Sequence, residues 1–404
     1  DEEGNLVLNM NTMWRSRDLY KAWGDNVIAI TFLQSIVAKR IEKTAGRPVR
    51  VGSYADYSSA LHIYGQDFGA VGGDCERGLQ SFFDTFDEET FVARALTSVA
   101  GQSETPATVV VADNGSTDGS VECAERLGAR VVRFPTNLGF SQAVNEAARG
   151  CTTKYIMVLN NDAVLAPECL ARLCGAAEQS EAGFAAPMVL SESDSDRLDA
   201  AWDLLSLSGC AMRAGHGCAV AGPFLGRRQI RFAPFTAILV RTSLFHSLGG
   251  LNDELGTYME DVEFGLRCNI AGETGIYEPA AVATHRGSAT HGAWSAEMVR
   301  RISRNQSLLV AMHWPNPMGP ALAWTVFVGQ TLWGLAALRH GRFVAWLRGK
   351  GQAWPRCREL RRKPRSCSAG TLLAILRESE SEIPSISTGA YWRLYRFLTP
   401  HGGA

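Results

Sequence analysis

Apolar segments alternate with helix-like segments over residues 109–177, and this alternation constrains the fold more than any other feature of the sequence. The strand-like segments are Val109–Ala112, Val131–Phe134 and Tyr155–Leu159, and the helix-like segments are Val121–Leu127, Ser141–Ala148 and Pro167–Ala177. Such alternation is typical of parallel strands connected by helices that cover the sheet. We therefore predict an α/β fold with a mostly parallel sheet.

The length and composition are those of a globular protein with more than one domain. The chain has 404 residues, of which 46% are hydrophobic and 20% are charged. The N-terminal part has two strand patterns, Leu6–Asn11 and Val49–Tyr54, which flank a long apolar helix pattern. We expect three parts, with boundaries at 1–97, 98–312 and 313–404.

The net charge argues against a nucleic-acid-binding site, and the cysteine spacing argues against a zinc site. The formal net charge of -1 gives no overall attraction to a polyanion, so we expect no nucleic-acid partner. The ten cysteines include no CxxC pair and no spacing with histidine that suits zinc. They are typical of reduced thiols in the cytosol.

A polar turn follows the first strand of the alternating region. Asp113, Asn114 and Ser116 stand in the sequence VVVADNGSTDGS, where the strand ends. Ligands of open α/β sheets bind at the carboxyl ends of strands, so these side chains could contact a base or a ribose. The alternative is a helix N-cap made by Ser116 or Asp118. Taken alone, this turn favours the N-cap.

Two later segments add polar groups at the same predicted edge. Gly139 and Asn145 occur in NLGFSQAVNEAA, where a glycine at a strand-to-helix turn would leave room for a ligand. Asp162 ends the buried strand of YIMVLNNDAVL. A carboxylate there can bind Mg²⁺ or Mn²⁺ that bridges diphosphate oxygens.

A carboxylate pair and a histidine complete the set. Glu260 and Asp261 stand at a predicted helix start in MEDVEFGLR, and His285 follows a strand in AVATHRGS. The structural alternative for the carboxylates is a solvated helix N-terminus, where the helix dipole favours them. For His285 the structural and the functional interpretation are equally open.

This order of motifs resembles the family-2 glycosyltransferases, inverting enzymes with the GT-A fold, and in particular their rhamnosyltransferase-like branch. The resemblance covers about residues 98–312. It implies that Asp113 and Asn114 contact the base and ribose of the donor, with Ser116 in the same turn. It also implies that Gly139 and Asn145 shape this pocket.

The resemblance further implies the chemistry. Asp162 corresponds to the metal-binding Asp, within Asn-Asn-Asp instead of Asp-X-Asp, and His285 lies near the metal and the diphosphate. Asp261 corresponds to the catalytic base, with Glu260 beside it. The enzyme would transfer a sugar from dTDP-rhamnose or a UDP-hexose, with Mg²⁺ or Mn²⁺, to a cell-surface glycan or a lipid-linked acceptor. The anomeric configuration would invert.

The first part of the chain resembles thymidylate synthases and deoxycytidylate hydroxymethylases. The matching segments are WRSRDLYKAWGDN (14–26) and GSYADYSSALHIYGQDF (52–68). The resemblance implies an α+β fragment with a dUMP-site remnant, made of Arg15, Ser16, Asp18, Asn26, His62 and Tyr64. An alternative function is therefore methyl or hydroxymethyl transfer to a pyrimidine deoxynucleotide.

Two features that the resembled families possess are missing from this sequence. The nucleophilic cysteine of that family precedes the Arg-Ser pair, whereas the first cysteine here is Cys75. The segment GLQSFFDTFDEETFV is also too acidic for the apolar first strand of a complete family-2 domain. We expect a junction near residues 94–104 and a missing first strand, with an inactive nucleotide-binding chimera as a further alternative.

The C-terminal part predicts helices that associate with a membrane. Met318–Leu338 contains no charged residue, and ten Lys and Arg residues against one Glu follow between Arg339 and Arg365. A basic helix with interleaved aromatic residues suits an anionic membrane interface. A spanning helix and a soluble helical hairpin are the alternatives. We expect a cytoplasmic protein on the inner face of the plasma membrane.

Overall fold

The computed structural model describes residues 6–12, 49–56, 88–287, 294–387 and 389–400. The chain divides into two compact units, Asp1–Thr85 and Phe86–Ala404. In the first unit, β1 (Leu6–Thr12) and β2 (Val49–Asp56) pair in parallel. The residues of the predicted dUMP-site remnant lie outside the described residues: Arg15, Ser16, Asp18, Asn26, His62 and Tyr64. One strand pair does not support a thymidylate-synthase-like fragment.

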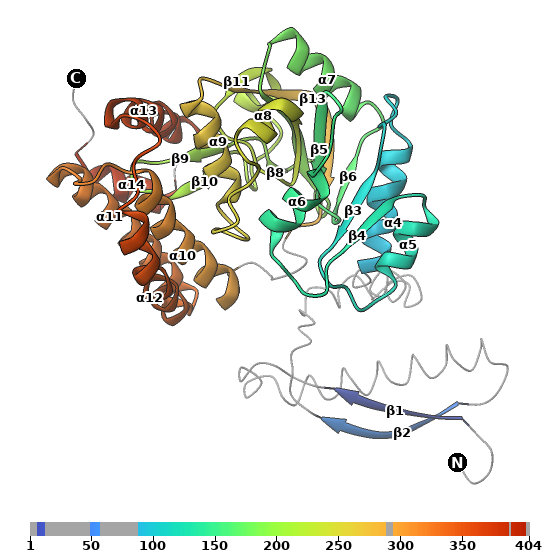
Figure 1. Ribbon diagram of the computed structural model, residues 1–404. Helices are drawn as coiled ribbons and strands as arrows, with labels where there is room; N and C mark the ends of the chain where they lie inside the picture. The colour runs from blue at the N-terminus through green and yellow to red at the C-terminus, as the bar shows by residue number, and fades with distance from the viewer. Residues whose placement is uncertain (1–5, 13–48, 57–87, 288–293, 388, 401–404) are drawn as a thin grey trace. The chain divides into compact units, whose positions relative to one another are not determined.

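A seven-stranded sheet forms the centre of the second unit (Figure 1). Its strand order is β11-β13-β7-β12-β5, with β6 paired to β13 and β8 paired to β7. These strands are β5 (Tyr155–Leu159), β6 (Ala163–Leu165), β7 (Phe184–Ser191), β8 (Leu198–Ala200), β11 (Arg228–Ile230), β12 (Ala237–Arg241) and β13 (Gly275–His285). Two further pairs stand beside it: β3 (Val110–Asp113) with β4 (Arg130–Arg133), and β9 (Asp203–Leu205) with β10 (Ala211–Arg213).

The sheet is mixed, so the prediction of a mostly parallel sheet was wrong. β3 with β4 and β7 with β13 are parallel, whereas β12 is antiparallel to both of its neighbours, β5 and β7. The alternation in the sequence covers only β3 to β5. After β7 the chain re-enters the sheet through β12 in the opposite direction, and only the later β13 again runs parallel to β7. The α/β class itself is confirmed.

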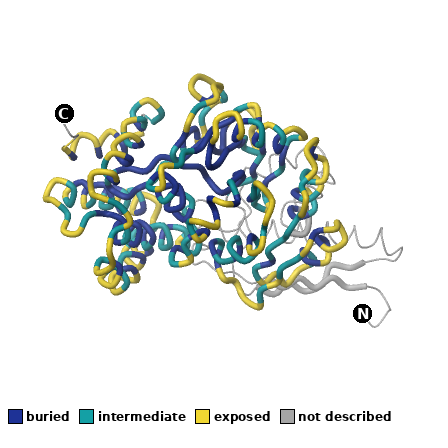
Figure 2. Tube along the Cα trace, turned by 45° about the horizontal axis from the view of Figure 1, so that its top comes forward, coloured by how far each residue is buried: buried dark blue, intermediate teal, exposed yellow. Residues whose placement is uncertain are grey.

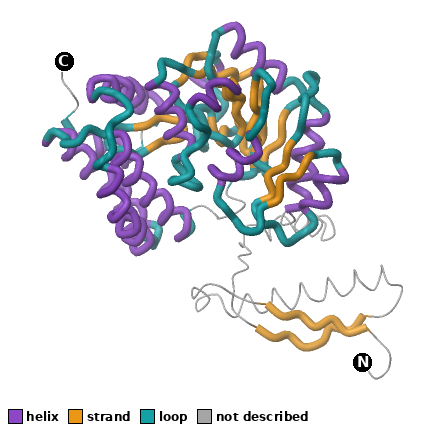
Figure 3. Tube along the Cα trace, viewed as in Figure 1, coloured by secondary structure: helices purple, strands orange, loops and turns teal. Residues whose placement is uncertain are grey.

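Helices cover both faces of the sheet (Figure 3). They are α4 (Glu88–Ala100), α5 (Ser120–Arg126), α6 (Phe140–Ala148), α7 (Cys169–Gln179), α8 (Thr242–Ser247) and α9 (Glu260–Ile270), with a 3₁₀ turn at Gly222–Leu225. Leu173 of α7 packs on one face, and Phe245 of α8 with Phe264 of α9 packs on the other. Buried residues accordingly concentrate in the sheet (Figure 2).

Five C-terminal helices pack against the same unit. They are α10 (Ala296–His313), α11 (Pro320–Arg339), α12 (Phe343–Leu360), α13 (Ala369–Ile386) and α14 (Ala390–Leu398). Ser379 and Glu380 of α13 accept hydrogen bonds from the backbone amides of Leu205 and Leu207, at 2.8 and 2.7 Å. Val328 and Leu332 of α11 belong to the same buried cluster as Phe184 of β7, so the predicted helical region shares a core with the α/β part.

Candidate active site

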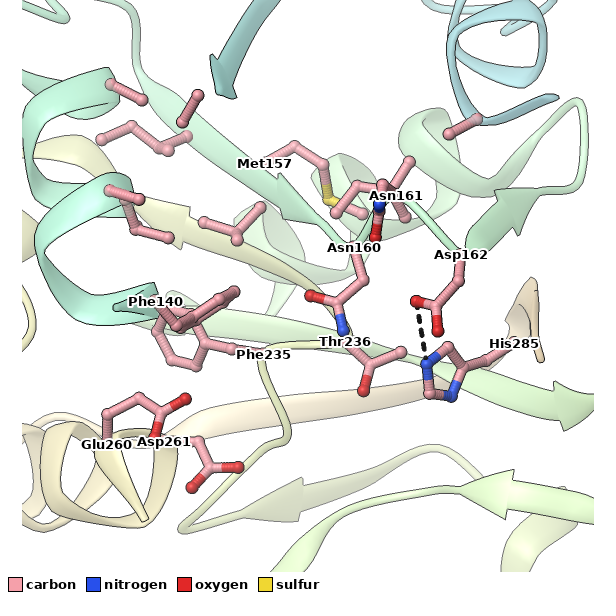
Figure 4. Close-up of a pocket in the computed structure, with 18 of the residues that line it drawn as sticks. Phe140, Met157, Asn160, Asn161, Asp162, Phe235, Thr236, Glu260, Asp261 and His285 are labelled. Carbon is pink, nitrogen blue, oxygen red and sulfur yellow. Dashed lines mark ion pairs between the residues drawn. The ribbon is translucent and has the colours of Figure 1, made fainter. Parts of the chain in front are cut away.

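One cavity of about 2110 Å³ lies at the carboxyl ends of β3, β5 and β13 and at the start of α9 (Figure 4). Seven of the predicted site residues line it: Asp113, Asn114, Ser116, Asp162, Glu260, Asp261 and His285. They come from four separate elements of the chain. The fold thus brings together the groups that the sequence placed at strand ends and at a helix start.

The turn after β3 is organised by its own side chains. Asp113 is buried, and its Oδ1 accepts a hydrogen bond from the amide of Ser116 at 3.0 Å. Asn114 Oδ1 accepts from the amide of Leu138 at 2.7 Å. The amide of Ser120, at the start of α5, bonds to Asp118 rather than to Ser116. The N-cap interpretation therefore does not account for Ser116.

Gly139 and Asn145 are not among the residues that line the cavity, and their place in a nucleotide pocket stays a prediction. Gly139 has a φ of 87°, and an added Cβ would lie 3.3 Å from the Cα of Gly256. Asn145 Nδ2 donates to the carbonyl of Leu251 at 2.8 Å, and its Oδ1 accepts from the amide of Leu251 at 2.8 Å. Both residues attach α6 to the loop that precedes α9.

His285 bridges two carboxylates at the end of β13. Its Nε2 lies 3.2 Å from Oδ1 of Asp162, and its Nδ1 lies 2.8 Å from Oδ2 of Asp199. Burial alone would lower the pKa of His285, but these two carboxylates raise it to about 9. Burial opposes ionisation of Asp199 as well, yet hydrogen bonds from His216 and His285 hold its pKa well below the usual range.

A second group of carboxylates surrounds Asp261. Burial, and then repulsion by Asp261, raise the pKa values of Glu260 and Asp203 well above their ordinary values. Burial also raises the pKa of Asp261, although the amide of Val262 and the charge of Arg213 partly offset it. A carboxylate with a raised pKa accepts a proton more readily, which suits a general base.

The backbone before α9 is held in an unusual conformation. Tyr258 and Met259 have φ values of 73° and 71°, in the left-handed region that costs a residue with a side chain about 1 kcal/mol or more. Asn305 of α10 is buried, and its Nδ2 lies within hydrogen-bond distance of the carbonyls of Leu255, Thr257 and Tyr258. Helix α10 therefore fixes the direction in which Glu260 and Asp261 enter the cavity.

Four of these residues were not identified from the sequence: Asp199, Asp203, Arg213 and Asn305. Arg213 donates to Asp199 at 3.2 Å, and it lies opposite Asp203 across the β9–β10 pair. Asp199 and Asp203 stand in DRLDAAWDLL, where no spacing distinguishes them from surface carboxylates. Asp199 and Asp203 belong to the site only because the pairing of β8, β9 and β10 brings them near His285 and Asp261.

Residues 83–248 match the family model of glycosyl transferase family 2. The chain contains a glycosyltransferase family 2 domain. The matched range includes the turn after β3 and the carboxylate Asp162. The match ends before α9 and before His285, so the roles of Glu260, Asp261 and His285 rest on geometry alone.

Curated relatives of the domain are glycosyltransferases. The chain is 28% identical over 272 residues to the N-acetylglucosaminyl-diphospho-decaprenol L-rhamnosyltransferase of Mycobacterium tuberculosis. The aligned region covers 60% of this chain and 87% of that protein. It is also 28% identical to the pre-mycofactocin glycosyltransferase of that organism, over 48% of this chain and 39% of the relative. The chain thus spans well under half of the second relative.

A solved structure with some similarity is a mannosyltransferase of Pyrobaculum calidifontis in complex with GDP-Man and Mn²⁺. The similarity has a TM-score of 0.42 at 17% sequence identity, and it covers 78% of this chain and 82% of that one. The comparisons add no support for a thymidylate-synthase-like N-terminal segment.

Proposed function

We propose that the chain transfers a sugar from a nucleotide-diphospho-sugar, of the dTDP-rhamnose or UDP-hexose class, to a hydroxyl of a lipid-linked or cell-surface glycan acceptor. The observation that carries this proposal is the convergence of the β3 turn, Asp162 with His285, and Glu260 with Asp261 on one cavity. The family match and the activity that the mycobacterial rhamnosyltransferase is named for support the donor class and the lipid-linked acceptor.

The reaction would be a single displacement with inversion. Asp261 accepts the proton of the acceptor hydroxyl as the hydroxyl oxygen attacks the anomeric carbon and the bond to the diphosphate breaks. Asp261 is partly exposed to the cavity, whereas Glu260 is almost fully buried, so Asp261 is the better placed of the two. The β3 turn holds the nucleoside, with Asp113 and Asn114 nearest to the base and ribose.

To test the function, the protein is incubated with dTDP-rhamnose and UDP-hexoses and a polyprenyl-diphosphate-linked N-acetylglucosamine. We expect a glycosylated product in which the configuration at the transferred sugar's anomeric carbon is inverted, as seen by NMR. A product with retained configuration would contradict the single displacement.

We propose that Asp162, which follows β5, and His285, at the end of β13, hold a divalent cation. Among the described residues no group of three or more His, Cys, Asp and Glu side chains is arranged to hold a metal ion. Asp162 would supply one ligand, and His285 would supply a second once its ring loses the proton that the two carboxylates favour. Mg²⁺ or Mn²⁺ commonly completes its shell with water and diphosphate oxygens. Because imidazole suits Mn²⁺ better than Mg²⁺, we favour Mn²⁺. Such an ion would neutralise charge on the departing nucleoside diphosphate.

Asp199 is proposed as a positioning residue for this pair of ligands. It holds Nδ1 of His285, so that Nε2 faces Asp162. We expect Asp199→Asn to weaken Mn²⁺ binding by roughly 10- to 100-fold, because the ring loses its orienting carboxylate. The measurement is a Mn²⁺ titration that is monitored by electron paramagnetic resonance. The control variant is Asp194→Asn, on an exposed loop. Equal affinities in the two variants, both folded by circular dichroism, would remove Asp199 from the site.

We also propose that α11 and α12 attach the protein to the inner face of the plasma membrane, as a cytoplasmic peripheral protein. Among the described residues α11 is the one helix long and apolar enough to cross a bilayer, and 33% of its most apolar window is buried. Its exposed large side chains recur at helical spacing: Trp324, Phe327, Leu335 and Leu338. Arg339 and Arg342 follow at the corner with α12, which exposes Val344 and Leu347.

This attachment predicts binding to anionic vesicles. Leu338→Glu should lower co-sedimentation with phosphatidylglycerol vesicles several-fold, because it places a negative charge in the apolar face. Leu225→Glu is the matched control, since Leu225 is equally exposed but stands in the 3₁₀ turn. High salt should release the wild-type protein. Salt-resistant binding, or equal binding of both variants, would contradict attachment at this face.

A further inference from the structure

Three buried polar side chains each carry an oxygen atom that has no hydrogen-bond partner. They are Asp203 of β9, Glu260 at the start of α9 and Gln306 of α10, and their exposed fractions are 5%, 7% and 1%. Among the described residues, nothing donates to Asp203 Oδ2, Glu260 Oε2 or Gln306 Oε1. Buried polar atoms in proteins are nearly always paired, so these three exceptions need a physical explanation.

All three side chains line the cavity, and so does Asp261. Figure 4 shows Glu260 and Asp261 together at the start of α9. Leu205 of β9, Val262 of α9 and Leu309 of α10, which are close in sequence to the three polar residues, pack in a single buried cluster. The elements β9, α9 and α10 therefore converge at this part of the cavity, and they bring the unpartnered oxygens next to the proposed base.

Arg213 forms its ion pair with Asp199 and not with these carboxyl groups. It stands opposite Asp203 across the β9–β10 pair, yet its Nη1 donates to Oδ2 of Asp199 at 3.2 Å. Burial, and then repulsion by Asp261, raise the pKa values of Asp203 and Glu260 well above the ordinary range. Each of the two therefore holds a proton more firmly than an exposed carboxylate does, and a protonated carboxyl group both donates and accepts hydrogen bonds.

A ligand with several adjacent hydroxyl groups matches this set of atoms. A hydroxyl group donates and accepts hydrogen bonds, as do a protonated carboxyl group and a side-chain amide. Rotation about the last side-chain bond, whose energy minima are broad, can turn either atom of each end group toward the cavity. A metal cation fits less well, because its ligands must be deprotonated and the raised pKa values of the two carboxyl groups oppose this.

We propose that Asp203, Glu260 and Gln306 bind the hydroxyl groups of the acceptor sugar and hold it beside Asp261. This inference rests on the proposed function, and it assigns to the acceptor the part of the cavity that β9, α9 and α10 form. The subsite also selects among sugars, because an acceptor that lacks a matching hydroxyl group leaves buried oxygens unpaired.

The test uses the full chain and the variants Asp203→Leu and Gln306→Met, which replace polar end groups by apolar ones of nearly the same shape. Binding of the methyl glycosides of N-acetylglucosamine, glucose, galactose and rhamnose is measured by saturation-transfer NMR without donor. We expect at least one glycoside to bind the wild type saturably and to bind each variant at least ~10-fold more weakly. The melting temperature of each variant should equal or exceed that of the wild type, because an unpartnered polar group leaves the interior.

Gln330→Met is the matched control, because the end group of Gln330 in α11 has partners outside the cavity. Its Oε1 accepts from Nζ of Lys350 at 2.6 Å, and its Nε2 donates to the carbonyl of Ser208 at 3.2 Å. This variant should lose stability and keep the affinity of the wild type for the glycoside, because it removes hydrogen bonds that the sugar does not use.

Three results would overturn the proposal. The first is that no glycoside binds the wild type. The second is that both variants bind the glycoside as the wild type does. The third is that they lose as much stability as Gln330→Met, which would show that their polar end groups support the fold. Binding of UDP or dTDP to the same protein separates the two proposals: nucleotide binding without glycoside binding refutes this subsite alone, and failure of both refutes the proposed function as well.

Discussion

Replacing Asp261 by asparagine is expected to lower kcat for sugar transfer by roughly 10²- to 10⁴-fold, the range that a positioned general base contributes. The amide keeps the shape of the side chain but has little basicity. Its oxygen can still accept the hydrogen bond from the amide of Val262, which lies 2.8 Å from Oδ1 in the wild-type protein. KM for the donor should change little, because the proton is transferred only as the new bond forms.

The thermal stability of Asp261→Asn distinguishes loss of the catalytic base from unfolding of the variant. Asp261 raises the pKa values of its neighbours Glu260 and Asp203, so removing its charge relieves repulsion. The melting temperature of Asp261→Asn should therefore equal or exceed that of the wild type. Asp196→Asn, on an exposed loop outside the cavity, is the matched control and should retain full activity. Unchanged transfer by Asp261→Asn would show that another group is the base.

The second large effect is expected from Glu263→Gln. Glu263 is almost fully buried in α9 and accepts hydrogen bonds from Arg267, with Nε at 3.0 and 2.9 Å, and its Oε1 lies 3.0 Å from Nε2 of His313. Arg267 in turn donates to the carbonyls of Leu248 and Gly250. Removing the negative charge leaves the largely buried guanidinium of Arg267 without its carboxylate, which costs about 3 to 5 kcal/mol of unfolding free energy. Urea denaturation measures this loss.

An exposed ion pair provides the comparison. Glu297 of α10 pairs with Arg300 and Arg301 at the surface. Glu297→Gln should cost less than about 1 kcal/mol, because water screens exposed pairs. Equal losses in the two variants would show that the network around Glu263 adds nothing beyond a surface pair.

The same network predicts a loss of stability in acid. Burial alone would raise the pKa of Glu263, but the hydrogen bond from His313 and the charge of Arg267 lower it from 4.5 to about 2. A group whose pKa is depressed by folding stabilises the protein fully above its unfolded pKa, and this contribution fades as the pH falls from about 4.5 to about 2. Glu263→Gln should lose less stability over this interval than the wild type.

The sequence predicted the local part of the fold well. The segments Val121–Leu127 and Tyr155–Leu159 correspond closely to α5 and β5, because apolar periodicity and turn residues act over a few positions. Asp162 was assigned to the edge of the sheet because it follows a buried strand, and Asp261 was assigned to the site by the family resemblance of the helix start at MEDVEFGLR. The structure brings both to the same cavity.

What the sequence could not predict depends on contacts between distant residues. The bond between Asn145 and a loop 106 positions further along the chain has no signal in the local sequence. Asp199 contacts His285 across 86 positions, and no local pattern marks Asp199. The antiparallel direction of β12 was missed for the same reason. The missing first strand stays a prediction, and the open edges of β3 and β5 are the structural feature that it would explain.

The most direct test of the central claim is binding of nucleoside diphosphates to the cavity. Isothermal titration of UDP, dTDP and GDP, each with and without Mn²⁺, is made with the wild type, Asp162→Asn and the control Asp196→Asn. We predict saturable binding of UDP or dTDP that requires Mn²⁺, is lost in Asp162→Asn and is unchanged in Asp196→Asn. Absence of binding of all three nucleotides, or binding that Asp162→Asn leaves intact, would contradict a donor site at the ends of β3 and β5.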